Sequence, residues 1–317
     1  MNPVNTMNWQ ALTTQACELG ESPFWHPQEQ MLYWVDIPGK QILRSNGTPG
    51  SVETWAMPSE PGCMAPAASG GLVVALRSGV FRARTWGGPL DHLVTLDYDV
   101  AHMRANDGKC DALGRFWIGT IDETKLARNA ALYALDCRTG TPVLECKTDP
   151  VTLPATTANG LAWSPDGHTL YWADTPSHLV HAWNFDMTTA AMTAHRTFAQ
   201  VQPKPAGWQF ASAADNGGYQ GRPDGAAVDV QGNYYVAMFE GRRICKFGPD
   251  GRLLAEFPTP AQCPTMPCFG GPDLQTLFVT SASHGRSAAE LAEFPLSGCV
   301  FSIRVDVPGL PVNCFVD

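Results

Sequence analysis

The chain has 317 residues, of which 44% are hydrophobic and only 16% charged, and its formal net charge at pH 7 is −9. This is the composition of a globular protein, and the negative charge argues against nucleic acid or an anionic membrane surface as a partner. The first residues lack the basic and apolar regions of a signal peptide, and no apolar run is long enough to span a membrane. We therefore expect a cytoplasmic protein.

The chain contains ten cysteines, which are scattered along the sequence. Because an export signal is missing, we interpret them as mostly reduced residues of the core or of strands. Cys263 and Cys268 are the closest pair, and they lack the spacing of a zinc finger and a second pair.

Six segments share one pattern, in which a turn is followed by large apolar residues and then by a small or acidic residue. In chain order they are residues 27–37, 68–79, 112–122, 165–175, 230–241 and 271–282. The matching positions are Tyr33, Val73, Trp117, Tyr171, Tyr235 and Phe278, at intervals of 40, 44, 54, 64 and 43 residues. A strand-rich unit of this length is the blade of a β-propeller, whereas a β-sandwich would not repeat at this spacing. The sequence predicts an all-β, six-bladed β-propeller, with residues 1–317 as a single domain.

The longest interval contains residues 200–220, which lack the alternation of a strand. One interpretation is a plain surface insertion. The other is a loop over the mouth of the propeller, because the segment runs directly into Arg222, Pro223 and Asp224.

Oxygen-bearing side chains recur in four repeats, 11 or 12 residues before the matching position: Glu21, Asn106, Asn159 and Asp224. Asp224 and Gly225 precede a strand expected at residues 226–230, which a turn connects to a second strand at 234–237. Equivalent points of propeller blades lie at the same height and radius, so we expect the four side chains to meet on the axis.

Two carboxylates with amide oxygens, and no His or Cys, form a set suited to calcium, magnesium or manganese, while zinc would be matched less well. Singly, each residue could be an ordinary turn former. Glu21 fits that alternative poorly, because Glu-Ser-Pro is not a favoured turn and Glu is depleted in strands. The set therefore predicts one divalent cation on the axis.

Several phrases resemble the SMP-30/gluconolactonase/LRE family: "GESPFWHPQEQMLYWVDI", "RANDGKCDALGRFWIGT", "NGLAWSPDGHTLYWADT" and "GRPDGAAVD". The resemblance runs from about Cys17 to the end of the chain and implies a six-bladed propeller with one axial metal. It implies that Glu21, Asn159 and Asp224 are the metal ligands, and that Arg104 and Asn106 contact the substrate.

The resemblance departs from the family pattern at one position. Some members place a substrate-binding Glu shortly after the Gly-Thr pair, and here Thr124 stands in that column. The adjacent Glu123 is therefore the candidate for this contact.

The chemistry follows from such a site. A divalent cation polarises a lactone carbonyl, and a carboxylate at its edge takes the proton of the attacking water. Asp224 is the better candidate for this general base, and the resemblance implies the same role. Arg104 and Asn106 are two residues apart on an extended stretch, so their side chains share one face and can hold ring hydroxyls.

Three functions are compatible with these observations. The first is a metal-dependent lactonase that opens a sugar lactone, resembling gluconolactone, to the aldonic acid. The second is a non-catalytic, metal-binding scaffold, which would not need Arg104 beside Asn106. The third is a phosphotriesterase-like hydrolase that uses the same metal. We favour the first, with a small sugar lactone as the partner.

Overall fold

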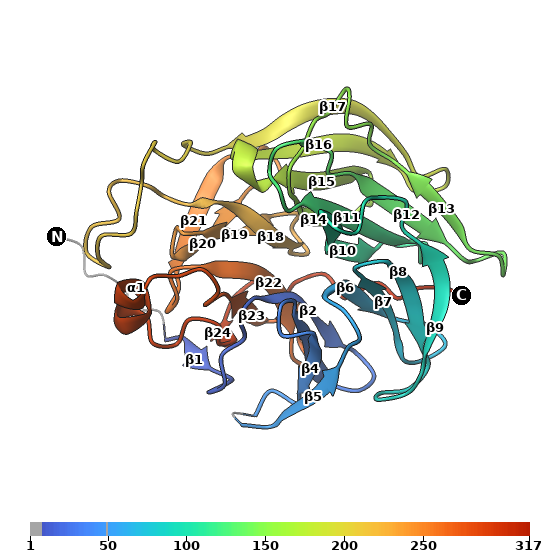
Figure 1. Cartoon of the computed structure of the whole chain (residues 1–317), viewed down its shortest axis with the longest axis horizontal. Helices are drawn as coiled ribbons and strands as arrows, with labels where there is room; N and C mark the ends of the chain where they lie inside the picture. The colour runs from blue at the N-terminus through green and yellow to red at the C-terminus, as the bar shows by residue number, and fades with distance from the viewer. Residues whose placement is uncertain (1–7, 49) are drawn as a thin grey trace.

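A computed structural model describes residues 8–48 and 50–317 of the chain. Its strands form six four-stranded antiparallel sheets that surround a common axis like the blades of a propeller (Figure 1). The predicted six-bladed, all-β propeller is therefore confirmed. Outside the strands, the described residues contain a 3₁₀ turn (Thr175–Ser177) and the short helix α1 (Ala288–Glu293).

The strands of each blade follow one another from the axis outwards. Blade 1 contains β2 (Gly20–His26), β3 (Met31–Asp36), β4 (Gln41–Ser45) and β5 (Val52–Ala56). Blade 2 contains β6 (Pro61–Pro66), β7 (Leu72–Leu76), β8 (Gly79–Ala83) and β9 (Leu90–Thr95). Blade 3 contains β10 (Met103–Cys110), β11 (Phe116–Asp122), β12 (Leu132–Asp136) and β13 (Val143–Cys146).

The second half of the chain continues in the same order. Blade 4 contains β14 (Ala158–Trp163), β15 (Thr169–Asp174), β16 (Leu179–Asp186) and β17 (Ala191–Gln200). Blade 5 contains β18 (Arg222–Val228), β19 (Tyr234–Phe239), β20 (Arg243–Phe247) and β21 (Leu253–Pro258). Blade 6 contains β22 (Pro264–Gly270), β23 (Thr276–Ser281), β24 (Phe301–Arg304) and β1 (Gln10–Ala11).

Blade 6 closes the ring by combining both ends of the chain. The strand β1 pairs antiparallel with β24, so that Gln10 lies opposite Ser302. The backbone hydrogen bond from Leu12 N to Val300 O, 2.8 Å long, extends this closure. The first and last strands of the propeller therefore hold each other in place.

The repeated apolar positions all lie on the second strand of their blade and are buried. Several of them contact aromatic rings of the neighbouring blade, in tilted or edge-to-face arrangements. The Tyr171 and Tyr234 rings are 5.1 Å apart between blades 4 and 5, and the Tyr235 and Phe269 rings are 5.1 Å apart between blades 5 and 6. This packing contributes to the apolar burial between adjacent sheets.

The cysteines agree with the sequence-based interpretation. All ten are free, and eight of them are buried. Cys63 and Cys268, for example, lie on the inner strands β6 and β22.

Residues 201–221 contain no strand and lie at the rim of the propeller, between β17 and β18 (Figure 1). The segment is held to three neighbouring regions. Lys204 N donates to His178 Nε2 at 3.1 Å, Asn216 Nδ2 donates to Glu240 O at 3.0 Å, and Ala213 N donates to the Glu293 carboxylate. None of the helices in the described part of the chain has the length and apolar character needed to cross a membrane.

The buried histidines of blade 4 give the fold a pH dependence. Burial, together with the charge of His195, lowers the pKa of His181 to about 4. As the pH falls below about 6.5, the unfolded chain takes up this proton before the folded chain does, so stability is lost as the pH falls towards 4. In His181→Gln, we expect the loss of unfolding free energy between pH 7 and pH 5 to be smaller by about 2 kcal/mol.

Denaturant unfolding at both pH values measures this difference. The exposed His168, changed to Gln, is the matched control and should leave the pH dependence as in wild type. An unchanged pH dependence in His181→Gln would contradict the prediction.

Candidate functional site

A bulge interrupts the inner strand of every blade, and the four recurring residues Glu21, Asn106, Asn159 and Asp224 lie at these bulges. In β2 and β14, Glu21 and Asn159 are the last residues paired with the second strand before the register shifts. In β10 and β18, Asn106 and Asp224 each follow the last paired residue and lie within the bulge. Bulges commonly redirect side chains next to functional sites.

This register corrects two expectations. The four residues do not occupy one equivalent point of the repeat, because Asn106 and Asp224 lie one position later than Glu21 and Asn159. In addition, Asp224 does not precede a strand that begins at residue 226. The strand β18 already begins at Arg222, and Asp224 is its third residue. The Arg-Pro pair looks like a terminator in the sequence, yet both residues continue the ladder opposite Phe239 and Met238.

Glu21 and Asp224 are two buried carboxylates that interact across the axis, with exposures of 6% and 5%. Burial and then the charge of Asp224 raise the pKa of Glu21 well above its usual range. Burial raises the pKa of Asp224 to about 8, against the opposing charge of Arg222. Blades 1 and 5 are not neighbours in the ring, so the influence of Asp224 on Glu21 agrees with side chains that face the centre.

Few hydrogen bonds compensate these carboxylates. No hydrogen bond reaches the Asp224 carboxylate from residues 8–48 or 50–317. Glu21 accepts one, from Ser22 N at 3.3 Å. The absence of a bond from neighbouring backbone N–H groups to Asp224 argues against the alternative that it is an Asx-turn residue.

The two asparagines bind each other directly. Asn106 Nδ2 donates to Asn159 Oδ1 at 2.9 Å and to Ala158 O at 3.0 Å. Asn159 Nδ2 in turn donates to Thr175 Oγ1 at 2.8 Å, which fixes the orientation of its amide. The amides of blades 3 and 4 therefore form one connected pair.

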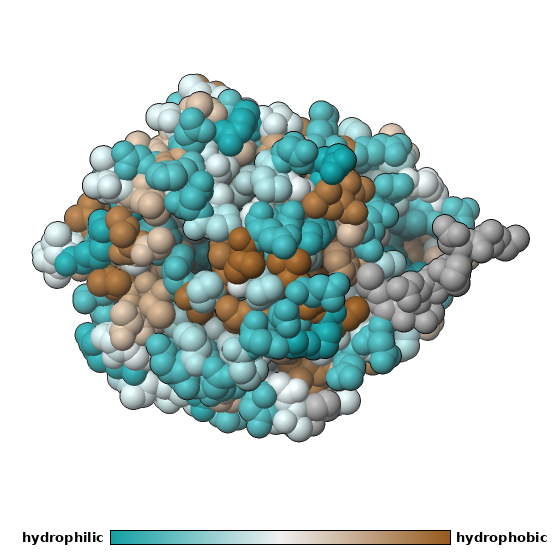
Figure 2. Space-filling model, turned by 180° about the vertical axis from the view of Figure 1, so that it is seen from behind, coloured by the Kyte–Doolittle hydropathy of each residue, from teal (hydrophilic) through white to brown (hydrophobic). Residues whose placement is uncertain are grey.

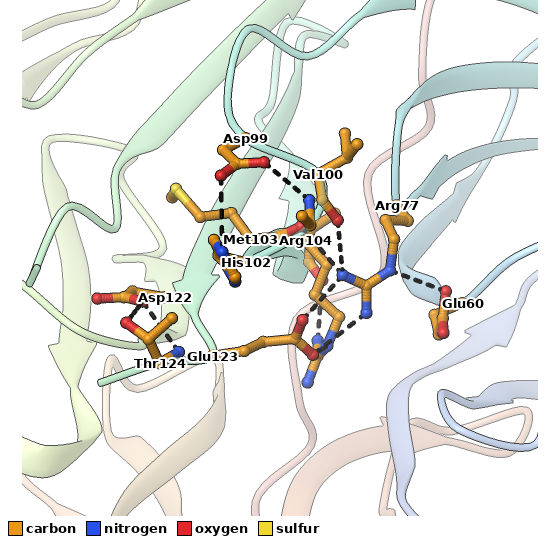
Figure 3. A network of polar contacts seen from close by, with 12 residues as sticks. Glu60, Arg77, Asp99, Val100, His102, Met103, Arg104, Asp122, Glu123 and Thr124 are labelled. Atoms are coloured by element: carbon orange, nitrogen blue, oxygen red, sulfur yellow. Dashed lines mark hydrogen bonds and ion pairs between the residues drawn. The ribbon is translucent and has the colours of Figure 1, made fainter. Parts of the chain in front are cut away.

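Arg104 connects the asparagine pair to Glu123, towards which its side chain points (Figure 3). Its Nη1 donates to Asn106 Oδ1 at 2.8 Å, and its Nε donates to Glu123 Oε1 at 3.2 Å. Arg77 binds the same carboxylate from blade 2, at 2.8 Å. The Thr124 hydroxyl donates to Asp122 instead, so Glu123 is the residue that faces Arg104.

Asp107, which the sequence pattern did not single out, connects the bulges of blades 3 and 4. Its Oδ2 accepts from Leu161 N at 2.9 Å, and its Oδ1 is buried without a partner among the described residues. Its charge also raises the pKa of both Glu21 and Asp224. The signal was present in the "RAND" phrase, where Asp107 directly follows Asn106, but an Asn-Asp-Gly run also suits an ordinary turn.

Gly225 gives Asp224 its place in the ring. A Cβ atom at Gly225 would lie 2.4 Å from Met266 Cβ on the neighbouring blade, so only glycine permits this approach of β18 to β22. The constraint at Gly225 therefore comes from the adjacent blade.

The donor set fits a divalent cation held by few protein ligands. Two buried carboxylates that repel each other, next to an amide oxygen, are stabilised when a cation binds between them. Within the described residues, no three His, Cys, Asp or Glu side chains gather in an arrangement that could hold a metal ion. The predicted set has only two carboxylates, so the amide of Asn159 would be needed as the third protein ligand.

A cavity of about 410 Å³ lies along the later residues of the inner strands, and neither Arg104 nor Glu123 lines it. Its lining is mainly apolar and includes Phe24, Val228 and Cys268, together with Lys109 and residues 310–313 of the C-terminal tail. Figure 2 shows apolar side chains gathered near the centre of the face turned away in Figure 1. The lining includes Ser22 but none of the six predicted site residues, Glu21, Arg104, Asn106, Glu123, Asn159 and Asp224.

Comparison with known proteins identifies the family. The sequence model of the SMP-30/Gluconolactonase/LRE-like region matches residues 19–283. The chain belongs to this family. The matched region contains all six predicted site residues.

Two relatives and one solved structure extend this result. The chain is 39% identical over 297 residues to a 6-deoxy-6-sulfogluconolactonase of Pseudomonas putida, covering 93% of this chain and 94% of the relative. It is 32% identical over 298 residues to regucalcin of Danio rerio, covering 93% of each. The structure of a calcium-binding regucalcin from Agrobacterium tumefaciens has a TM-score of 0.86 at 22% identity, covering 98% of this chain and 97% of that one. At this identity, the structural likeness shows the fold alone.

Proposed function

We propose that this protein hydrolyses a sugar lactone to the open-chain aldonic acid, with one divalent cation held by Glu21, Asn159 and Asp224. The observation that carries the proposal is the pair of buried carboxylates on the axis, Glu21 and Asp224, which almost no hydrogen bond compensates. The names of the family and of the Pseudomonas putida relative support a lactone as the substrate. That relative's substrate carries a sulfo group by name, so sulfo sugar lactones belong among the compounds to be tested.

The cation, which is calcium, magnesium, manganese or zinc in this proposal, supplies a Lewis acid that polarises the lactone carbonyl. Its positive charge also favours the ionised forms of the two carboxylates, whose pKa values are raised without it. Asp224 can then act as the general base at neutral pH.

The chain's own residues provide the remaining steps. Asp224 takes a proton from the water that attacks the carbonyl carbon, and it returns the proton to the ring oxygen as the C–O bond breaks. Arg104 and Asn106 donate to oxygens of the lactone, and Glu123 holds the Arg104 guanidinium in place at 3.2 Å. We propose in addition that residues 200–220 are an insertion at the mouth of a single propeller domain, because they contact Glu240 and His178 next to the inner strand β18.

The first test concerns the cation. In Glu21→Gln, one of the two carboxylate ligands is lost, and we expect the roughly one divalent ion bound per wild-type chain to be lost after dialysis. Elemental analysis of both proteins measures this. The control is Glu29→Gln. Glu29 lies on the hairpin that follows Glu21 and binds Arg44, so this variant should keep the wild-type ion content. An unchanged ion content in Glu21→Gln would contradict the assignment.

The second test concerns the base. Asp224→Asn retains the size and shape of the side chain but cannot accept a proton at neutral pH. We expect a folded protein whose kcat for lactone opening is lower by roughly two to four powers of ten. The matched control is Asp166→Asn, because Asp166 is exposed and accepts from His168 N at 3.0 Å in a turn. Near-normal lactone hydrolysis by Asp224→Asn would remove Asp224 from the catalytic role.

A further inference from the structure

Arg222 on blade 5 and Arg104 on blade 3 occupy the same register position. Each arginine stands one residue before the last pair that precedes the bulge: Arg104 lies opposite Ile121, and Arg222 lies opposite Phe239. Each is followed two residues later by a polar residue within the bulge, which is Asn106 or Asp224. The two arginines therefore enter the ring at the same level from two blades.

The two arginines differ in how fully their donors are used. Arg104 donates to Glu123, to Ala105 O and to Asn106. Among the described residues, the Arg222 guanidinium forms one ion pair, with Glu240 at 3.3 Å. Burial raises the pKa of the Tyr219 hydroxyl to about 12, and the charge of Arg222 opposes this rise. The Arg222 side chain is 22% exposed and lies 5.1 Å from the Phe239 ring centre. Arg222 is thus held in place by an aromatic ring while most of its five donors are available.

Two further cations lie around the same glutamate. Lys204 Nζ is 2.8 Å from Glu240 Oε2, and Arg286 Nη1 is 3.1 Å from Glu240 Oε1. Arg286 also approaches Glu290, at 3.6 Å. Three cations therefore face two buried carboxylates, so the group formed by Lys204, Arg222, Arg286, Glu240 and Glu290 has one more positive than negative side chain.

This cationic group lies beside the proposed catalytic carboxylate. Arg222 is two residues from Asp224 on β18, and its charge is the largest favourable influence on the ionised form of Asp224. Lys204 comes from the segment 201–221, where its ammonium lies 4.6 Å from the Trp208 ring centre. A substrate with its carbonyl near Asp224 would extend its far end towards these cations.

We propose that Arg222, together with Lys204 and Arg286, binds an anionic substituent of the sugar lactone, a sulfonate or a phosphate carried at the end remote from the carbonyl. The planar guanidinium presents parallel donors that match the oxygens of such an anion, and an uncompensated charge in a partly buried position favours binding. This inference rests on the proposed lactonase function and makes Arg222 a residue that determines specificity.

The test compares two substrates in wild type and in Arg222→Gln: gluconolactone and the same lactone with a sulfonate or phosphate at carbon 6. A hydrogen bond between charged groups contributes roughly 1.5–3 kcal/mol, so the ratio of kcat/KM for the anionic substrate to that for the neutral one should fall about 10- to 100-fold. Salt should lower kcat/KM for the anionic lactone more than for the neutral one. A fall with either anion supports the proposal, and the larger fall identifies the preferred one.

Three variants serve as controls. Arg222→Lys keeps the charge and should restore part of the ratio. Arg304→Gln removes a surface cation that binds Asp273, and it should leave the ratio unchanged. Arg104→Gln should lower kcat/KM for both lactones by similar factors, because its proposed contacts are to the sugar ring.

The outcomes separate this inference from the function on which it rests. If wild type opens neither lactone, the proposed function fails and the role of Arg222 fails with it. If wild type opens both lactones with equal kcat/KM, or if Arg222→Gln keeps the wild-type ratio, the lactonase function stands and only the role of Arg222 is overturned.

Discussion

The burial of two carboxyl groups, Glu21 and Asp224, is the constraint on which the centre of this propeller depends. Glu21 and Asp224 come from blades 1 and 5, and each is almost completely removed from water. The charges of Arg104 and Arg222 offset this burial only in part, since the pKa of both carboxyl groups stays raised, and the fold must supply the remaining free energy elsewhere. The closed ring supplies it, because aromatic packing between blades and the pairing of β1 with β24 fix the inner strands regardless of what their bulges carry. In our proposal, a cation bound between the two carboxylates relieves this cost.

The bulges convert a repetitive fold into an asymmetric site. Relative to the bulge of their own strand, Asn106 and Asp224 lie one position later than Glu21 and Asn159 do. Within this arrangement, Asn106 of blade 3 binds Asn159 of blade 4. Arg104 binds Glu123, which follows the second strand of the same blade. In our proposal, blades 3 and 4 bind the sugar through neutral amides and one arginine, and the adjacent blade 5 receives a charged end through Arg222.

The fold could be predicted from the sequence because the same apolar pattern recurs once in each blade. Six copies of one apolar pattern at blade spacing allow few alternatives, and every matching residue lies on a second strand. The candidate site was found by counting back along each repeat, which located Glu21 and Asp224 but not their register. A bulge adds a residue without changing composition, so the offset of one position in Asn106 and Asp224 could not be distinguished from variation in turn length. Asp107 and the cations around Glu240 depend on contacts between blades, which no single repeat encodes.

The most direct test of this carboxylate pair is the free energy of unfolding of wild type and Glu21→Gln, each with a chelator and with an excess of a divalent cation. Without cation, the variant should be at least as stable as wild type, because the substitution removes a carboxyl group whose ionised form burial disfavours. With cation at 100 times its Kd, wild type should gain about 2.7 kcal/mol and the variant little or nothing. A variant that is less stable than wild type under chelation, and that responds to the cation as wild type does, would contradict the role assigned to the pair.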